Sequence, residues 1–185
     1  MSNAYLDKLK GILTTAQNDD ELYELIVNAP YSDQLTATHL DLGIVVLLLV
    51  NTETAMIDRV ALSDTFSARG AVNLSAKPFR QIKIPVNHPE NAISQAIATG
   101  QPQAVTDWKY LFIPDLKPRE ARLNQAGTGI ECSLVYPFKS RDGGALIFSL
   151  YQPIQNIGPM HHDFAKAYTK LVDSQLSQSR RAIAN

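Results

Sequence analysis

The segment from residue 129 to residue 151, GIECSLVYPFKSRDGGALIFSLY, constrains the fold most strongly. Within residues 130–138 the even positions are all apolar and the odd positions are mixed, which is the period of a strand with a buried face. Residues 145–151 are apolar at nearly every position, a pattern typical of a strand covered on both faces. Asp142 and Gly143 lie between the two runs and favour a tight reversal, because glycine tolerates positive φ angles. The segment therefore predicts a β-hairpin in a sheet that forms a middle layer.

The rest of the chain alternates between helical and strand patterns. Segments with the pattern of strands are residues 44–50, 56–62, 82–86 and 103–106. Segments with helical spacing are residues 4–16, 18–30, 89–99, 118–125 and 163–177. Residues 63–80 have no clear period and are expected to be a loop with at most one helical turn. Helices at both ends and a mostly antiparallel sheet predict an α+β fold.

Composition limits the domain organisation and the partners. The 185 residues, 45% of them hydrophobic, are enough for one core, so we expect a single domain. Its expected parts are N-terminal helices in residues 1–30, a sheet core in residues 40–157 and a C-terminal helix in residues 160–180. A net charge of −1 argues against nucleic acid, whose binding proteins are usually basic. The longest apolar run falls far short of the roughly 20 residues of a membrane helix, and no leader is visible, so we expect a cytoplasmic protein without a membrane partner.

Residues 82–108 and 129–150 resemble segments of the GAF domain, a relative of PAS domains that serves as a small-molecule sensor and dimerisation module. The run IKIPVNHPENAISQAIATGQPQAVTDW, residues 82–108, is similar to the strand, helix, "Thr-Gly-x-Pro" and "x-x-Asp" order of that family. Residues 129–150 are similar to its "Arg-Ser-x-x-x-x-Pro" strand and following hairpin, and a terminal helix after Gly158 and Pro159 also fits. The resemblance implies a six-stranded antiparallel sheet with the N- and C-terminal helices on one face. A ligand-side helix and loops would cover the other face.

By the same resemblance, a ligand cavity would lie between the central strands, the helix at residues 89–99 and the loops at residues 63–80 and 106–128. The residues expected to bind the ligand are Phe66, Ile84, Ala92, Ala96, Thr106, Asp107, Trp108, Tyr110, Phe112, Cys132, Leu134 and Tyr136. The aromatic members would supply an apolar wall with a few polar tips, as in many small-ligand pockets. The alternative is that these aromatic residues only fill the core.

No family-specific chemistry is complete in this chain. Bilin-carrying GAF domains hold their cysteine ahead of the strand that contains Cys132, so this residue does not match that role. GAF-type free methionine sulfoxide reductases use cysteines in loops over the cavity, and a mechanism that ends in a disulfide needs two, whereas this chain has one. We therefore interpret Cys132 as a small core residue.

Histidines and nucleotide signatures give no stronger signal. His161 and His162 are adjacent in a predicted helix and point about 100° apart, so they are unsuited to sharing a metal. His39 and His88 stand alone, which disfavours haem, and no metal site is expected. The cyclic-nucleotide signature of some GAF domains, Asn-Lys, Phe and Asp-Glu, is largely missing from residues 156–164.

The sequence thus predicts a non-catalytic sensory or regulatory domain that binds an unidentified small molecule and signals through its terminal helices. The alternative is a ligand-free GAF fold that serves as a dimerisation or protein-interaction module. Both hypotheses include a homodimer formed by the helices at residues 4–16 and 163–177. No cofactor is expected, and an enzyme is the least favoured class.

Overall fold

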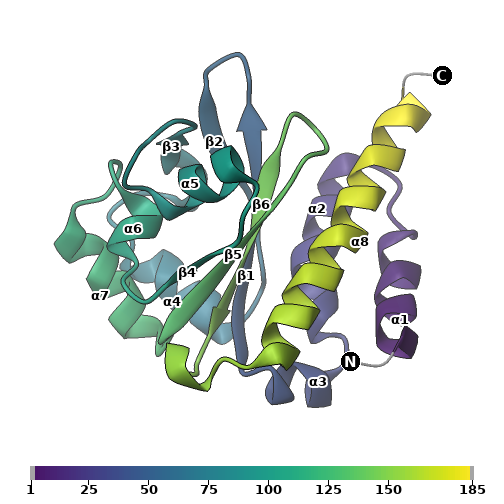
Figure 1. Cartoon of the computed structure of the whole chain (residues 1–185), viewed down its shortest axis with the longest axis horizontal. Coiled ribbons are helices and arrows are strands. Elements are labelled where there is room, and N and C mark those ends of the chain that lie inside the picture. The colour runs from purple at the N-terminus through teal and green to yellow at the C-terminus, as the bar shows by residue number, and fades with distance from the viewer. Residues whose placement is uncertain (1–2, 184–185) are drawn as a thin grey trace.

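A six-stranded antiparallel sheet runs through the middle of the molecule (Figure 1). A computed structural model describes residues 3–183. The strand order is β3-β2-β1-β6-β5-β4, and every neighbouring pair is antiparallel. The strands are β1 (Leu42–Asn51), β2 (Met56–Leu62), β3 (Lys83–Pro85), β4 (Gln103–Val105), β5 (Cys132–Phe138) and β6 (Gly144–Leu150). This arrangement confirms the predicted α+β class and the hairpin formed by β5 and β6.

Helices cover both faces of the sheet (Figure 1). The terminal helices α1 (Asn3–Leu13), α2 (Asp19–Asn28) and α8 (Pro159–Ile183) cover one face. The other face carries α4 (Phe66–Leu74), α5 (Ala92–Thr99), α6 (Lys109–Phe112) and α7 (Pro118–Thr128). The short helix α3 (Gln34–His39) leads into β1, and three 3-10 turns occupy Ala29–Tyr31, Phe79–Gln81 and Ile154–Asn156. No helix within residues 3–183 has the length and apolar character needed to cross a lipid bilayer.

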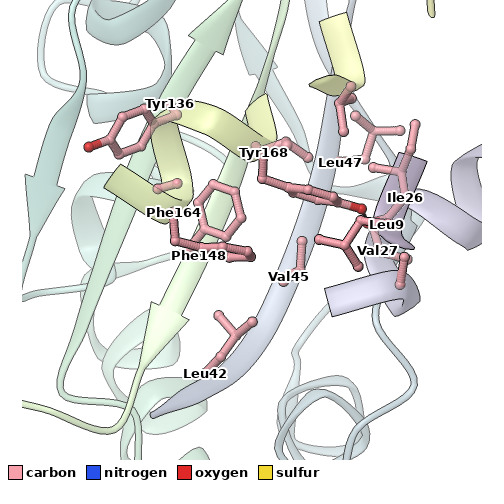
Figure 2. Packing of buried hydrophobic residues seen from close by; sticks show 14 of the residues in the cluster. Leu9, Ile26, Val27, Leu42, Val45, Leu47, Tyr136, Phe148, Phe164 and Tyr168 are labelled. Atoms are coloured by element: carbon pink, nitrogen blue, oxygen red, sulfur yellow. Dashed lines mark hydrogen bonds between the residues drawn. The ribbon is translucent and has the colours of Figure 1, made fainter. Parts of the chain in front are cut away.

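The alternation of side chains along β1 divides the interior into two cores. Val45 and Leu47 pack under the terminal helices, whereas Val46 and Leu48 face α4–α7. Figure 2 shows the core under the terminal helices, where Phe148 of β6 lies beside aromatic side chains of α8. Both faces of the central strands are therefore buried, as the continuous apolar run of β6 predicted.

A β-bulge interrupts the pairing of β1 and β2. Leu47 pairs with Ala61, but Leu48 pairs with Arg59, so Val60 is an extra residue in β2. A bulge reverses the side-chain parity of a strand at that point. As a result Ala61 packs in the core under the terminal helices, whereas Arg59 points to the other face of the sheet, toward α4–α7.

Two elements differ from the sequence-based expectation. Residues 63–80 contain the nine-residue helix α4 instead of a loop, capped by the Thr65 hydroxyl, which accepts a hydrogen bond from the Ala68 N–H. α4 has no continuous apolar stripe, because its inward residues are small and its larger apolar residues are exposed. The helix α3 was also not expected; it begins at a cap formed by Asp33. The helix α5 ends at Gly100, which has a left-handed φ of 67°.

Candidate ligand-binding site

A small apolar cavity lies between the sheet and the helices α4, α6 and α7. Its volume is about 40 Å³. Val46 of β1 and Ile147 of β6 form part of its floor, and Ala71 of α4, Trp108 and Phe112 lie across from them. The cavity is on the face of the sheet opposite the terminal helices, where the GAF resemblance placed a ligand. It is smaller than an engineered apolar cavity of about 150 Å³ that admits benzene.

Arg59 is the one charged residue that lines this cavity within the described part of the chain. The residue is only 4% exposed. Its Nη2 donates a hydrogen bond of 3.0 Å to the backbone carbonyl of Leu111, and its buried Nε has no hydrogen-bond partner. The guanidinium Cζ lies 4.4 Å from the centre of the Phe112 ring and 5.9 Å from that of Phe79. Two aromatic faces therefore contact this cation.

The carboxylate of Asp115 acts on Arg59 through its charge but pairs with Lys77 instead. Burial lowers the pKa of Arg59 to about 10, and the charge of Asp115 partly opposes that shift. Asp115 itself accepts a hydrogen bond of 2.6 Å from Lys77 Nζ and one of 3.3 Å from the Lys83 backbone N–H. At neutral pH Arg59 is thus a charged group in an apolar wall, without a carboxylate in contact.

Hydrogen bonds hold the Trp108 indole in the cavity wall. Its Nε1 donates a bond of 3.0 Å to the hydroxyl of Ser133, which lies 2.8 Å from the hydroxyl of Ser149. The Trp108 backbone N–H donates to the side-chain oxygen of Gln125 in α7 at 2.9 Å. These bonds connect β5, β6 and α7 around one aromatic side chain, and Trp108 is the only tryptophan in the sequence.

The structure brings part of the predicted set to this cavity. Trp108 and Phe112 line it. Ile84, Ala92 and Ala96 are buried in the same core but do not line the cavity. All five residues lie on the side of the sheet where the ligand was expected. Contact between any of them and a ligand stays a prediction.

Four predicted residues lie outside the cavity, which corrects their expected placement. Phe66 is 85% exposed because it occupies the outward side of the first turn of α4. Tyr110 is 41% exposed and, with Thr106, borders a separate surface depression. Asp107 accepts hydrogen bonds from Arg122 at 2.8 and 2.9 Å and one from the Lys109 N–H, so it fixes the entry to α6.

Cys132, Leu134 and Tyr136 face the wrong side of the sheet for this cavity. They are the even residues of β5, and strand alternation places them in the core under the terminal helices. The odd residues Ser133 and Val135 face the cavity side instead. Because both faces of β5 are buried, hydrophobicity alone did not distinguish them. Burial raises the pKa of the Cys132 thiol to about 11, which opposes a nucleophilic role.

Sequence reasoning did not identify Arg59 as part of the site. It shares the period-two phase of Ile57 and Ala61 in the segment MIDRVAL, so an arginine at an apparently buried position was the available signal. The bulge at Val60 then determines that Arg59 faces the cavity and Ala61 does not. A bulge of this kind leaves no clear mark in the sequence.

Comparison with solved structures identifies the fold, although no protein-family model and no curated protein sequence matches the chain. The chain is similar over its full length to a GAF domain of a phosphoenolpyruvate-protein phosphotransferase from Coxiella burnetii, with 15% identity, full coverage of both chains and a TM-score of 0.64. A methyl-accepting chemotaxis protein fragment has 13% identity and a TM-score of 0.63, with 96% of this chain and 99% of that chain covered. A free methionine-R-sulfoxide reductase from Neisseria meningitidis has 14% identity and a TM-score of 0.58, with 98% and 95% covered. The chain therefore has the fold of a GAF domain.

Proposed function

We propose that this protein is a non-catalytic sensory or regulatory domain that binds a small molecule between its sheet and the helices α4, α6 and α7. The observation that carries the proposal is the apolar cavity at that place, with Arg59 and Trp108 in its wall. Two of the similar structures come from a phosphotransferase and a chemotaxis protein, which supports a role in signalling. The bound molecule is unidentified.

The size of the cavity requires that its wall moves when a larger molecule binds. Small-ligand pockets usually have volumes of about 300–1,000 Å³, well above the 40 Å³ found here. α4 is the wall element that we expect to move, because Phe66 and Leu74 on this helix are exposed. The Ser67 hydroxyl of α4 donates to the Thr128 carbonyl of α7 at 3.0 Å and lies 2.6 Å from the Tyr151 hydroxyl. We expect α4 to shift outward when the site is occupied.

In this proposal, the turn between β5 and β6 would transmit ligand binding from the cavity floor to the terminal helices. Arg141 in this turn donates hydrogen bonds of 2.5 and 2.6 Å to the Asp19 carboxylate of α2, and one of 3.2 Å to Ser179 of α8. The Ser140 backbone N–H donates to the Asp173 carboxylate of α8 at 2.8 Å. A change in the curvature of β5 and β6 on ligand binding would alter these contacts and so the packing of α2 and α8.

A screen that uses Trp108 as the reporter tests this proposal. A metabolite library is added to the protein, melting temperature identifies binders, and the indole N–H resonance of Trp108 is then measured with each binder. We expect at least one compound to raise the melting temperature and shift this resonance, and to change amide hydrogen exchange in α8. Compounds that stabilise the protein without moving the Trp108 signal would place binding elsewhere and contradict the proposal.

A second candidate function is a ligand-free interaction module. The small cavity volume and the exposed apolar side chains of Phe66, Leu74 and Leu123 on α4 and α7 favour it. In that case no compound in the screen would move the Trp108 signal. Catalysis is less favoured, because the single cysteine is buried in the core under the terminal helices.

A further inference from the structure

We infer that Arg59 is the anchor for the carboxylate of a small, otherwise apolar molecule that occupies this cavity. The inference rests on the proposed function and specifies the chemical class of its ligand. It is carried by the hydrogen-bonding state of Arg59, by the partners of Asp115 and by the composition of the cavity wall.

Arg59 has unused hydrogen-bonding capacity in a buried place. A guanidinium has five N–H donors, and in the described structure Arg59 uses one of them, in the bond to Leu111. The Nε donor is buried and has no partner. Leaving a buried donor of a charged group unsatisfied is unfavourable, so a group that accepts from this guanidinium would bind favourably.

Within residues 3–183, no carboxylate forms a hydrogen bond or ion pair with Arg59. Asp115 is near enough to favour the charged form of Arg59, but its own oxygens accept from Lys77 and from the Lys83 backbone. The Leu111 carbonyl and the Phe112 ring hold the guanidinium at the cavity wall instead. The guanidinium of Arg59 is therefore held in place, and its positive charge remains available to a bound anion.

The cavity wall favours a carboxylate over a phosphate. Arg59 is the one cation among the described lining residues, and the side chains around it are mainly aliphatic or aromatic. One guanidinium matches a single negative charge, and its planar fork matches the two oxygens of a carboxylate. A phosphate dianion would keep an uncompensated charge in an apolar site. The volume of about 40 Å³ favours a short or flat apolar group behind the carboxylate.

Paired probes of equal shape test the inference. Acetate, butyrate and benzoate are titrated against acetamide, butyramide and benzamide at constant ionic strength, with inorganic phosphate as a separate anion. The readout is the indole N–H resonance of Trp108, since this single tryptophan lies in the cavity wall. The proteins are the wild type, Arg59→Met, Arg59→Lys and, as a matched exposed control, Arg119→Met.

We expect at least one carboxylate to bind the wild type about ten- to a hundredfold more tightly than its amide, as hydrogen bonds to charged groups allow. Arg59→Met should remove this preference, Arg59→Lys should weaken it, and Arg119→Met should retain it. If amides bind the wild type as tightly as carboxylates, or phosphate more tightly than both, the inference is wrong but a ligand site remains. If carboxylate preference persists without Arg59, the inference is also wrong. If no probe moves the Trp108 signal, the inference fails, and a metabolite that moves it in the wider screen would preserve the proposed function.

Discussion

Arg141 and Arg59 are both largely buried, but only Arg141 has a carboxylate partner. The Arg141 side chain is 17% exposed and forms a two-bond contact with Asp19 between the β5–β6 turn and α2. Arg59 contacts a carbonyl and aromatic rings. A buried cation that is paired with a carboxylate stabilises the fold. A buried cation without a carboxylate partner can instead interact favourably with a bound anion. This contrast is the residue-level basis of the assignment of Arg59 to a ligand.

The Arg141–Asp19 contact predicts a pH dependence of stability. The hydrogen bonds from Arg141 lower the pKa of Asp19, so the folded state holds the ionised carboxylate more tightly than the unfolded state. The stabilisation is complete above the unfolded pKa of about 4 and is lost as the pH falls through the lower folded pKa. Asp19→Asn should reduce the free energy of unfolding by about 1–2 kcal/mol near neutral pH.

Urea denaturation near pH 7 and near pH 3 measures this effect. The difference between wild type and Asp19→Asn should shrink at the lower pH, because below a pH of about 4 the unfolded wild type takes up a proton at Asp19. Asp20→Asn is the matched control, because Asp20 is an exposed neighbour in the same helix turn. A difference that is the same at both pH values would show that Asp19 stabilises the fold without its charge.

Cys132 should be chemically inert in the folded protein. Its side chain is fully buried in the sheet, and burial raises the pKa of its thiol to about 11, so very little thiolate forms near neutral pH. A colorimetric disulfide reagent should react with the thiol in denaturant and not measurably in native buffer over the same time. Fast reaction of the native protein would contradict this burial and reopen thiol chemistry.

At the scale of elements, two glycines should respond to alanine in opposite directions. A Cβ at Gly144, in β6, would overlap the Leu48 carbonyl oxygen in the neighbouring strand and lie 2.5 Å from the Phe138 ring. Gly144→Ala should lower the free energy of unfolding by about 1–3 kcal/mol, because the strands must separate. Gly11 is exposed in α1, and a Cβ there meets nothing within 4 Å. Gly11→Ala should raise the free energy of unfolding by about 0.5–1 kcal/mol.

Chemical denaturation of the two variants beside the wild type gives both values. The sign of the difference distinguishes a glycine required by close packing from one that only loosens a helix. Equal effects of the two substitutions would contradict the described approach of β6 to β1.

Elements with strong local signals were predictable from the sequence. The hairpin of β5 and β6 has alternating apolar residues and an Asp-Gly turn, and α5 ends at Gly100 in the left-handed conformation. α4 was missed because it contains Gly70 and turns small residues inward, so its pattern lacks an apolar stripe. The even residues of β5 are buried as predicted, but they lie on the side away from the cavity, because burial on both sides leaves the sequence without a signal for which face meets the site. Tertiary contacts, absent from the local pattern, determine both features.

The candidate site was less predictable than the fold. Trp108 and Phe112 follow from an aromatic loop next to a sheet, and both line the cavity. The side of the sheet that Arg59 faces depends on the bulge at Val60, and the exposure of Phe66 depends on the rotation of α4. Positions that depend on one irregular residue are the ones that sequence periodicity fails to place.

For the whole molecule, we predict a homodimer formed through α1 and α8. Leu6 and Ile12 of α1 and Leu171 of α8 are only partly buried within one chain. Light scattering should give twice the mass of one chain, and Leu171→Glu should give the monomer because it places a charge in the proposed contact. Lys170→Glu, at the exposed neighbouring position, should leave the dimer intact. A wild-type monomer at high concentration would contradict the prediction.

The central claim, that the cavity holds a small molecule, is tested most directly by native mass spectrometry of freshly purified protein. The wild type is compared with Ala71→Leu, which adds side-chain volume to the α4 wall of the cavity. We predict that part of the wild-type protein carries the additional mass of a small molecule that gentle activation releases, and that Ala71→Leu lacks it. Wild-type protein at the bare chain mass, or the same added mass on both proteins, would contradict the claim.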